Sequence, residues 1–247
     1  MMFRSLTLVS LVAASVSLAQ AQAPAYRVID FCELHPGQGG NAAAAYREYA
    51  EQLKKAGWDR DRLVLRSQSG PQTMAVVRYY RSHADMSLGT GYPAKLQNNA
   101  ATMNLILARL NATCARMHRE IDLVIPELFS GSVGDPPRYY QRAKVTVKPE
   151  KIDEFRTALL SDIGPAIKKS GAKRYVAAQA EFGVARSVFS IAYSIESLAS
   201  LDKESAIATA MGKDGYQRYL AKVRPLITEA VYDLWEYMPD LSYIAPK

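Results

Sequence analysis

Residues 121–128, IDLVIPEL, close one half of the chain, and residues 232–241, YDLWEYMPDL, close the other. In both, an apolar residue, an aspartate and a leucine precede a proline, an acidic residue and a leucine. A pattern that recurs at about half the chain length indicates an internal repeat. We therefore expect each stretch to hold the last strand of one structural unit.

Outward from residues 121–128, the first half predicts the order strand, helix, strand, strand, helix, strand. Alternating apolar and polar residues predict the strands, and apolar residues three or four positions apart predict the helices. Asn41 is suited to cap the first helix and Gly57 to end it. The expected strands are 26–34, 62–68, 73–80 and 114–125, and the expected helices are 42–56 and 93–112.

The second half predicts the same order again. Its expected strands are 139–147, 173–181, 187–194 and 230–238, and its expected helices are 150–170 and 216–227. Gly164-Pro165 should kink or split the first of these helices, because proline lacks the backbone N–H that a helix interior needs. Between the halves, residues 129–137 (FSGSVGDPP) are rich in glycine and proline. We therefore place the first domain at 22–129, a linker at 130–137 and the second domain at 138–247.

The N-terminus predicts a signal peptide over residues 1–21. Arg4 precedes an apolar segment at 6–18, and the small residues Ala19 and Ala21 follow it, as in a signal that is cleaved before Gln22. The alternative is an N-terminal helix of the folded domain. No stretch of 18 apolar residues is present, so we expect no transmembrane segment. The expected location is periplasmic or secreted.

The composition argues against several classes of protein. The chain has 247 residues and a formal net charge of +7, from 31 lysines and arginines against 24 acidic residues. The basic residues are scattered among acidic ones, and an exported protein rarely meets nucleic acid, so we expect no nucleic-acid partner. Two cysteines are too few for a thiolate zinc site, and the three histidines lack the spacing of metal ligands. We expect no metal and no cofactor.

Two β-α-β-β-α-β units predict two tandem ferredoxin-like domains in an α+β fold. Such a sheet has helices on one face only, so its other face must also be covered. From Tyr26 to Met238 the order of elements resembles the dimeric α-β barrel superfamily, which includes the antibiotic-biosynthesis monooxygenases. The resemblance implies that the two sheets pack face to face as an intrachain α-β barrel. It includes no catalytic signature and therefore does not define a reaction.

This topology implies a disulfide between the two cysteines. Its strand order, 4-1-3-2, makes the first and last strands of a unit antiparallel neighbours. Cys32 lies near the end of the first strand and Cys114 at the start of the fourth, so the pairing brings them together. In an oxidising compartment we expect a Cys32–Cys114 bond. The alternative is two reduced, buried thiols.

The two-residue period of a strand assigns side chains to the faces of each sheet. In the last strand of the first unit, Met117, Ile121, Leu123 and Ile125 should face the helices. In the last strand of the second unit, we favour the inward set Asp233, Trp235 and Tyr237. The predicted ligand-binding residues of the barrel interior are Asp30, Arg116, His118, Glu120, Asp122, Tyr140, Arg142, Lys144 and Trp235.

These residues allow three functions. The first is a pocket that binds a small aromatic or anionic molecule without chemistry. The second is a cofactor-free oxygenase or isomerase, in which His118 beside a carboxylate is the candidate general base. The third is a non-catalytic interaction module, in which the charges only pair with one another. The sequence leaves open whether the protein is an enzyme, and whether it is a monomer or a homodimer.

Overall fold

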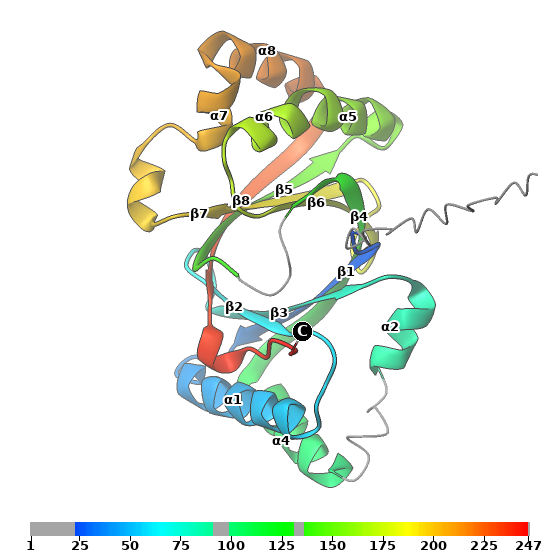
Figure 1. Ribbon diagram of the computed structural model, residues 1–247, viewed down its shortest axis with the longest axis vertical. Helices are drawn as coiled ribbons and strands as arrows, with labels where there is room; N and C mark the ends of the chain where they lie inside the picture. The colour runs from blue at the N-terminus through cyan, green and yellow to red at the C-terminus, as the bar shows by residue number, and fades with distance from the viewer. Residues whose placement is uncertain (1–22, 91–98, 131–135, 247) are drawn as a thin grey trace, which may run out of the picture.

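The computed structural model describes residues 23–90, 99–130 and 136–246 (Figure 1). The predicted signal peptide, 1–21, lies outside these residues. So do residues 131–135, which make up most of the predicted linker, and the start of the predicted helix 93–112. No helix in the described segments is long and apolar enough to cross a membrane.

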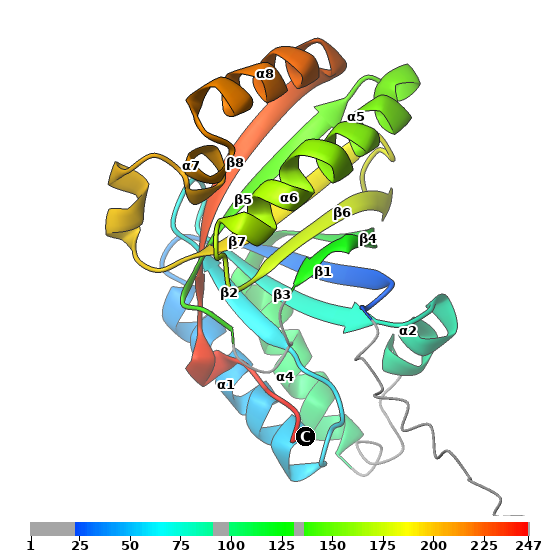
Figure 2. The ribbon, with the colours of Figure 1, turned by 45° about the horizontal axis from the view of Figure 1, so that its top comes forward.

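Eight antiparallel strands form a closed barrel in the order β1-β3-β2-β8-β5-β7-β6-β4. The strands are β1 Tyr26–Leu34, β2 Leu63–Ser67, β3 Thr73–Tyr80, β4 Cys114–Ser130, β5 Tyr139–Val147, β6 Tyr175–Phe182, β7 Val188–Ile195 and β8 Ile227–Tyr237. Within each half the order is last-first-third-second, as the resemblance implied. The helix-free sides of the two sheets face each other, and β2–β8 and β4–β6 pairs join the halves (Figure 2).

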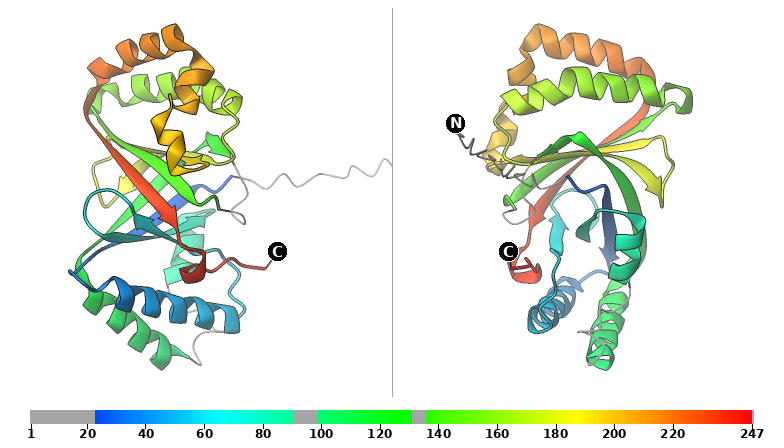
Figure 3. Two further views of the ribbon diagram at one scale, coloured as in Figure 1. Left: turned by 90° about the vertical axis from the view of Figure 1, so that its left-hand side faces the viewer. Right: turned by 45° about the vertical axis from the view of Figure 1, so that its right-hand side comes forward.

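The helices lie outside the barrel on two opposite sides (Figure 3). They are α1 Gly39–Lys55, α2 His83–Thr90, α4 Ala100–Thr113, α5 Ile152–Ala158, α6 Gly164–Lys169, α7 Ala206–Met211 and α8 Lys213–Val223. Helices α1 and α4 cover the first half, and α5, α6 and α8 cover the second. The predicted helix 150–170 is interrupted by a π-helical turn, Leu159–Ile163, immediately before Gly164-Pro165. In this turn the Gly164 N–H reaches the Leu159 carbonyl, which accommodates the proline.

Each half has its own apolar core between helices and sheet. The first core takes residues from α1, α4, β1, β2 and β3, and the second takes residues from α5, α6, β5, β6 and β7. The predicted Cys32–Cys114 disulfide is present and closes the first core at the point where α4 ends and β4 begins. It joins residues 82 positions apart in the sequence.

Strand β4 is longer than the sequence predicted. It continues past Ile125 to Ser130 and pairs with β1 in the first half and β6 in the second. Its far end enters the second core through Ile125 and Leu128. Met117 and Leu123 share the outer face of β4, as predicted, but they do not pack against the helices, because their side chains are 55% and 37% exposed. The first core extends over β1, β2 and β3 and takes only Cys114 from β4.

Candidate functional site

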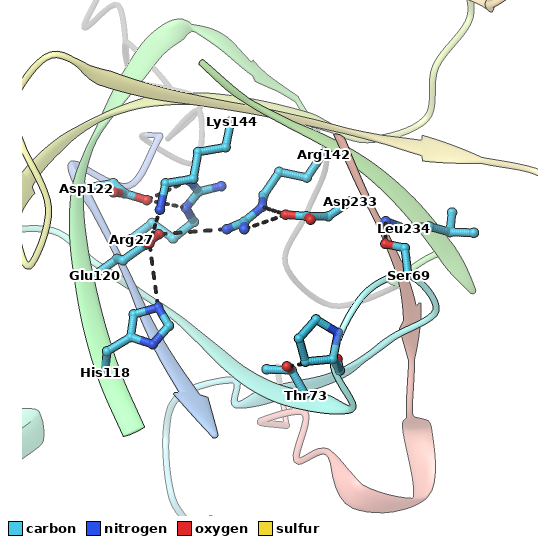
Figure 4. Close-up of polar contacts among 11 residues, drawn as sticks. Arg27, Ser69, Thr73, His118, Glu120, Asp122, Arg142, Lys144, Asp233 and Leu234 are labelled. Carbon is cyan, nitrogen blue, oxygen red and sulfur yellow. Dashed lines mark hydrogen bonds and ion pairs between the residues drawn. The ribbon is translucent and has the colours of Figure 1, made fainter. Parts of the chain in front are cut away.

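Alternate residues of the strands meet inside the barrel (Figure 4). The inward residues of β4 are His118, Glu120 and Asp122. They pair with Phe31, Ile29 and Arg27 of β1, in that order, and these three line the interior. Strands β5 and β8 add inward residues from the other half. The structure thus brings together seven of the nine predicted residues: His118, Glu120, Asp122, Tyr140, Arg142, Lys144 and Trp235. The favoured inward set of β8, Asp233, Trp235 and Tyr237, is also correct.

The two other predicted residues lie elsewhere. Arg116 has the inward register but is exposed at the end of the barrel. Asp30 faces outward, where Arg78 and Arg119 bind its carboxylate. The prediction for Asp30 failed because a register shift between Glu33 and Leu34 turns Cys114 to the helix side. The disulfide therefore marks the outer face of β1.

A buried ion pair joins β1 to β4. The Nε and Nη2 atoms of Arg27 donate to Oδ2 of Asp122 at 3.0 and 2.6 Å. Both side chains are 3% exposed. Burial acts to lower the pKa of Arg27, but Asp122, with Tyr79 and Glu120, outweighs it and the net shift is upward. Sequence analysis did not select Arg27, although the pairing of β1 with β4 places it directly opposite Asp122.

A second network crosses the interior from one half to the other (Figure 4). Lys144 of β5 donates a hydrogen bond to Oε1 of Glu120 on β4, and Arg142 Nη1 lies 3.7 Å from Oε2 of the same carboxylate. Arg142 also donates to Asp233 of β8 at 2.6 and 3.0 Å. Its guanidinium carbon lies 5.3 Å from the Phe31 ring centre and 5.7 Å from the Trp235 ring centre. Glu120, Asp122 and Asp233 are thus neutralised by cations.

His118 packs at one end of this network. Its ring stacks on Phe31 with centroids 4.5 Å apart, and its Nε2 lies 3.8 Å from Oε1 of Glu120. Partial burial lowers the pKa of His118. The charge of Glu120 acts to raise this pKa, whereas nearby cations lower it further. The imidazole is therefore neutral near pH 7. It does not line the cavity described next.

A cavity of about 80 Å³ lies inside the barrel beside the ionic network. Its walls are mainly apolar and aromatic and include Ile29, Phe31, Leu65, Val77, Phe129 and Trp235. An apolar cavity of about 150 Å³ in another protein holds benzene, so this space, about half as large, takes a single ring only when the surrounding side chains move apart. This mixture of apolar walls and few polar groups is typical of small-molecule sites.

Two hydrogen-bond donors that line the cavity lack acceptors among the described residues: Nε1 of Trp235 and Nη2 of Arg174. Trp235 is only 6% exposed. A buried donor without an acceptor is costly, so it requires an explanation such as a bound ligand or water. Sequence analysis did not select Arg174. The alternation of β6, which begins at Tyr175, could have placed it inward with Val176.

No group of three or more histidine, cysteine, aspartate or glutamate side chains that could hold a metal ion occurs in residues 23–90, 99–130 and 136–246. The interior carboxylates accept hydrogen bonds from arginine and lysine.

Comparison with solved structures reveals the same fold in other proteins. A candidate monooxygenase from Fusobacterium nucleatum subsp. nucleatum matches 90% of this chain and 95% of its own, with a TM-score of 0.66 and 12% identity. A candidate monooxygenase from Lactobacillus acidophilus matches 90% of this chain and 97% of its own, with a TM-score of 0.63 and 8% identity. An anthrone oxidase-like protein matches 91% of this chain and 94% of its own, with a TM-score of 0.59 and 11% identity.

These similarities show that the fold of this chain, a closed barrel with helices on its outside, also occurs in these proteins. No protein-family model and no curated protein sequence matches the chain. At such low identity, function must be argued from the site, because one fold supports many activities.

Proposed function

We propose that this protein is exported and binds a small, aromatic or anionic molecule inside its barrel without transforming it. The observation that carries the proposal is the apolar and aromatic cavity with Trp235 Nε1 and Arg174 Nη2 on its wall, both without acceptors among the described residues. A ligand that bears a hydrogen-bond acceptor would satisfy both donors and fill the apolar space.

Export is supported by the disulfide and by the predicted signal peptide. Disulfides form and persist in oxidising compartments such as the periplasm or the extracellular space. Cleavage before Gln22 would leave a mature chain of residues 22–247. We propose a periplasmic or secreted location on these grounds.

Binding without chemistry accounts for the polar interior better than catalysis does. A general base needs a free proton acceptor within hydrogen-bond reach of the substrate. Asp122, Glu120 and Asp233 are each bound by a cation, and His118 lies outside the cavity lining. The helix-free faces of the two sheets meet within the chain, so neither face is open to a partner as an interaction module would require.

A cofactor-free oxygenase or isomerase is the second candidate, because His118 is neutral at the inner wall of the barrel and could accept a proton. The similarity in fold to candidate monooxygenases is compatible with it. This function requires a substrate that extends past Phe31 to the imidazole. If His118→Gln abolishes turnover of a bound molecule but not its binding, the oxygenase or isomerase is correct.

Native mass spectrometry of protein purified from its own cells tests the proposal. We expect a chain that begins at Gln22, carries one disulfide, and has an added mass that is lost on denaturation. Ala192→Phe, which fills the cavity wall, should abolish the added mass. Ala230→Phe, which adds the same bulk at an exposed position of β8, should retain it. If the wild-type protein is recovered only as the bare chain, or if Ala192→Phe retains the added mass, the proposal is wrong.

A further inference from the structure

One cation inside the barrel has no carboxylate partner among the described residues. Of the inward side chains that are not fully exposed, four are cations: Arg27, Arg142, Lys144 and Arg174. Three carboxylates lie among them: Asp122, Glu120 and Asp233. Each of these is bound by one or two of the first three cations. A further inward carboxylate, Glu33, is half-buried near the end of β1, opposite the exposed Arg116. Arg174 forms no ion pair with any residue that the structure describes, so its positive charge has no carboxylate partner there.

Arg174 shares one end of the cavity with two other donors. Its backbone N–H donates to Oγ of Ser194 at 3.2 Å, and Ser194 N–H donates to the Arg174 carbonyl at 2.8 Å. Ser194 pairs with Tyr140 on one side of β5, and Trp235 pairs with Tyr140 on the other. The guanidinium of Arg174 interacts with the Tyr140 hydroxyl. The side chains of Arg174, Tyr140 and Trp235 all line the cavity.

Each of the three groups can donate a hydrogen bond to a ligand. The indole N–H of Trp235 and Nη2 of Arg174 have no acceptor among the described residues. Burial raises the pKa of Tyr140 far above its usual range, although Arg174 acts to lower it. The phenol therefore stays protonated. A charged guanidinium with two neutral donors beside it suits an oxyanion, because hydrogen bonds to a charged acceptor are the strong ones.

The rest of the cavity determines the size and polarity of the part of the ligand that carries no charge. Beyond the three donors the wall is mainly apolar and includes Phe31, Ile29, Leu65 and Val77, with Arg27, Tyr79, Ser130 and Arg142 as further polar side chains. The free space of about 80 Å³ excludes multi-ring molecules unless the barrel opens. One negative charge on the ligand would pair with Arg174.

We infer that the ligand is a monoanionic carboxylate on a single planar ring, held by Arg174, Tyr140 and Trp235 at one end of the barrel cavity. This inference rests on the proposed function and specifies the class of molecule that the cavity takes. The carboxylate lies at the end of the barrel where β5 and β6 begin, and the ring lies against Phe31 and Val77.

Calorimetric titration with benzoate and benzamide tests this inference on the full mature chain. The two probes have nearly the same shape, but only benzoate is charged. We expect benzoate to bind wild-type protein at least about tenfold more tightly, as charge-assisted hydrogen bonds require. Arg174→Met should remove that preference, because it weakens binding of the charged benzoate much more than binding of neutral benzamide. Arg186→Met, which removes an exposed arginine after β6, should behave as wild type.

The possible results test three separate claims: that the site prefers an anion, that Arg174 causes this preference, and that the cavity binds a single ring. Equal affinities of wild-type protein for the two probes would overturn the oxyanion site but leave the cavity function intact. A benzoate preference that survives in Arg174→Met would overturn the assignment of Arg174. If neither probe binds, both the inference and single-ring binding in the cavity are wrong. Should Arg174→Met fail to fold, the comparison of the two probes on wild-type protein still decides whether the site prefers the anion.

Discussion

Lys144 of β5 donates a hydrogen bond to Glu120 of β4 across the barrel, although these two strands are not neighbours in the sheet. The contact joins a residue of the first half to a residue of the second half through the interior. Together with the β2–β8 and β4–β6 pairs, it makes the two halves one closed structure. The barrel interior therefore depends on charges from both halves.

Loss of the Glu120 charge should destabilise the whole barrel. Glu120 is 2% exposed, and Glu120→Gln would leave Lys144 and Arg142 without their shared partner. Breaking a buried ion pair from one side costs roughly 3 kcal/mol. Urea unfolding at pH 7 should show a loss of about this size. Glu127→Gln, at an exposed position of the same strand, should change the free energy of unfolding by less than about 0.5 kcal/mol.

The contribution of Glu120 should depend on pH. Burial acts to raise the pKa of Glu120, but the hydrogen bond and charge of Lys144, with Arg142 and Arg27, outweigh it and hold the pKa below its usual range. A carboxyl group with a depressed folded-state pKa stabilises the protein above its unfolded pKa, about 4.3, and this stabilisation disappears as the pH falls through the folded value. The difference in stability between wild type and Glu120→Gln should therefore shrink between pH 6 and pH 3. A constant difference over this range would contradict the ion pair.

Reduction of the disulfide should lower stability substantially. The bond closes a long loop, with its cysteines 82 positions apart, and links β1 to the junction of α4 and β4. A loop of this length predicts a loss of about 4.5 kcal/mol through the entropy of the unfolded chain. Thermal unfolding with and without reductant measures it. The double variant Cys32→Ala, Cys114→Ala should unfold at the same temperature in both conditions, whereas wild type should not.

His118 should titrate below the usual histidine range. Partial burial lowers its pKa from about 6.5, and Glu120 acts in the opposite direction. Glu120→Gln should therefore lower the pKa of His118 further, because it removes the charge that favours the imidazolium. NMR titration of the ring protons distinguishes His118 from His35 and His83. A higher pKa in Glu120→Gln would show that another group controls the imidazole.

The order of elements could be predicted from sequence because it depends on local periodicity. Alternation along β5 and β8 also placed Arg142, Lys144 and Trp235 correctly on the inner face. Periodicity fails where a strand is irregular. The register shift at Glu33/Leu34 turned Cys114 outward and made the inference for Asp30 wrong.

The cavity itself could not be predicted from alternation. Its free space depends on how the side chains of β1, β3, β5 and β8 fit together, which is a property of three-dimensional packing. Alternation with Val176 could have placed Arg174 inward, but only the packed structure shows that its guanidinium has no ion-pair partner among the described residues.

The most direct test of ligand binding in the barrel uses the two tryptophans in an ¹H–¹⁵N NMR titration with benzoate. The indole N–H of Trp235 lines the cavity without an acceptor, whereas Trp58 packs against the first core outside the barrel. We expect saturable movement of the Trp235 indole signal, with the Trp58 signal unchanged. Movement of Trp58 alone, or an unchanged Trp235 signal at saturating benzoate, would contradict binding inside the barrel.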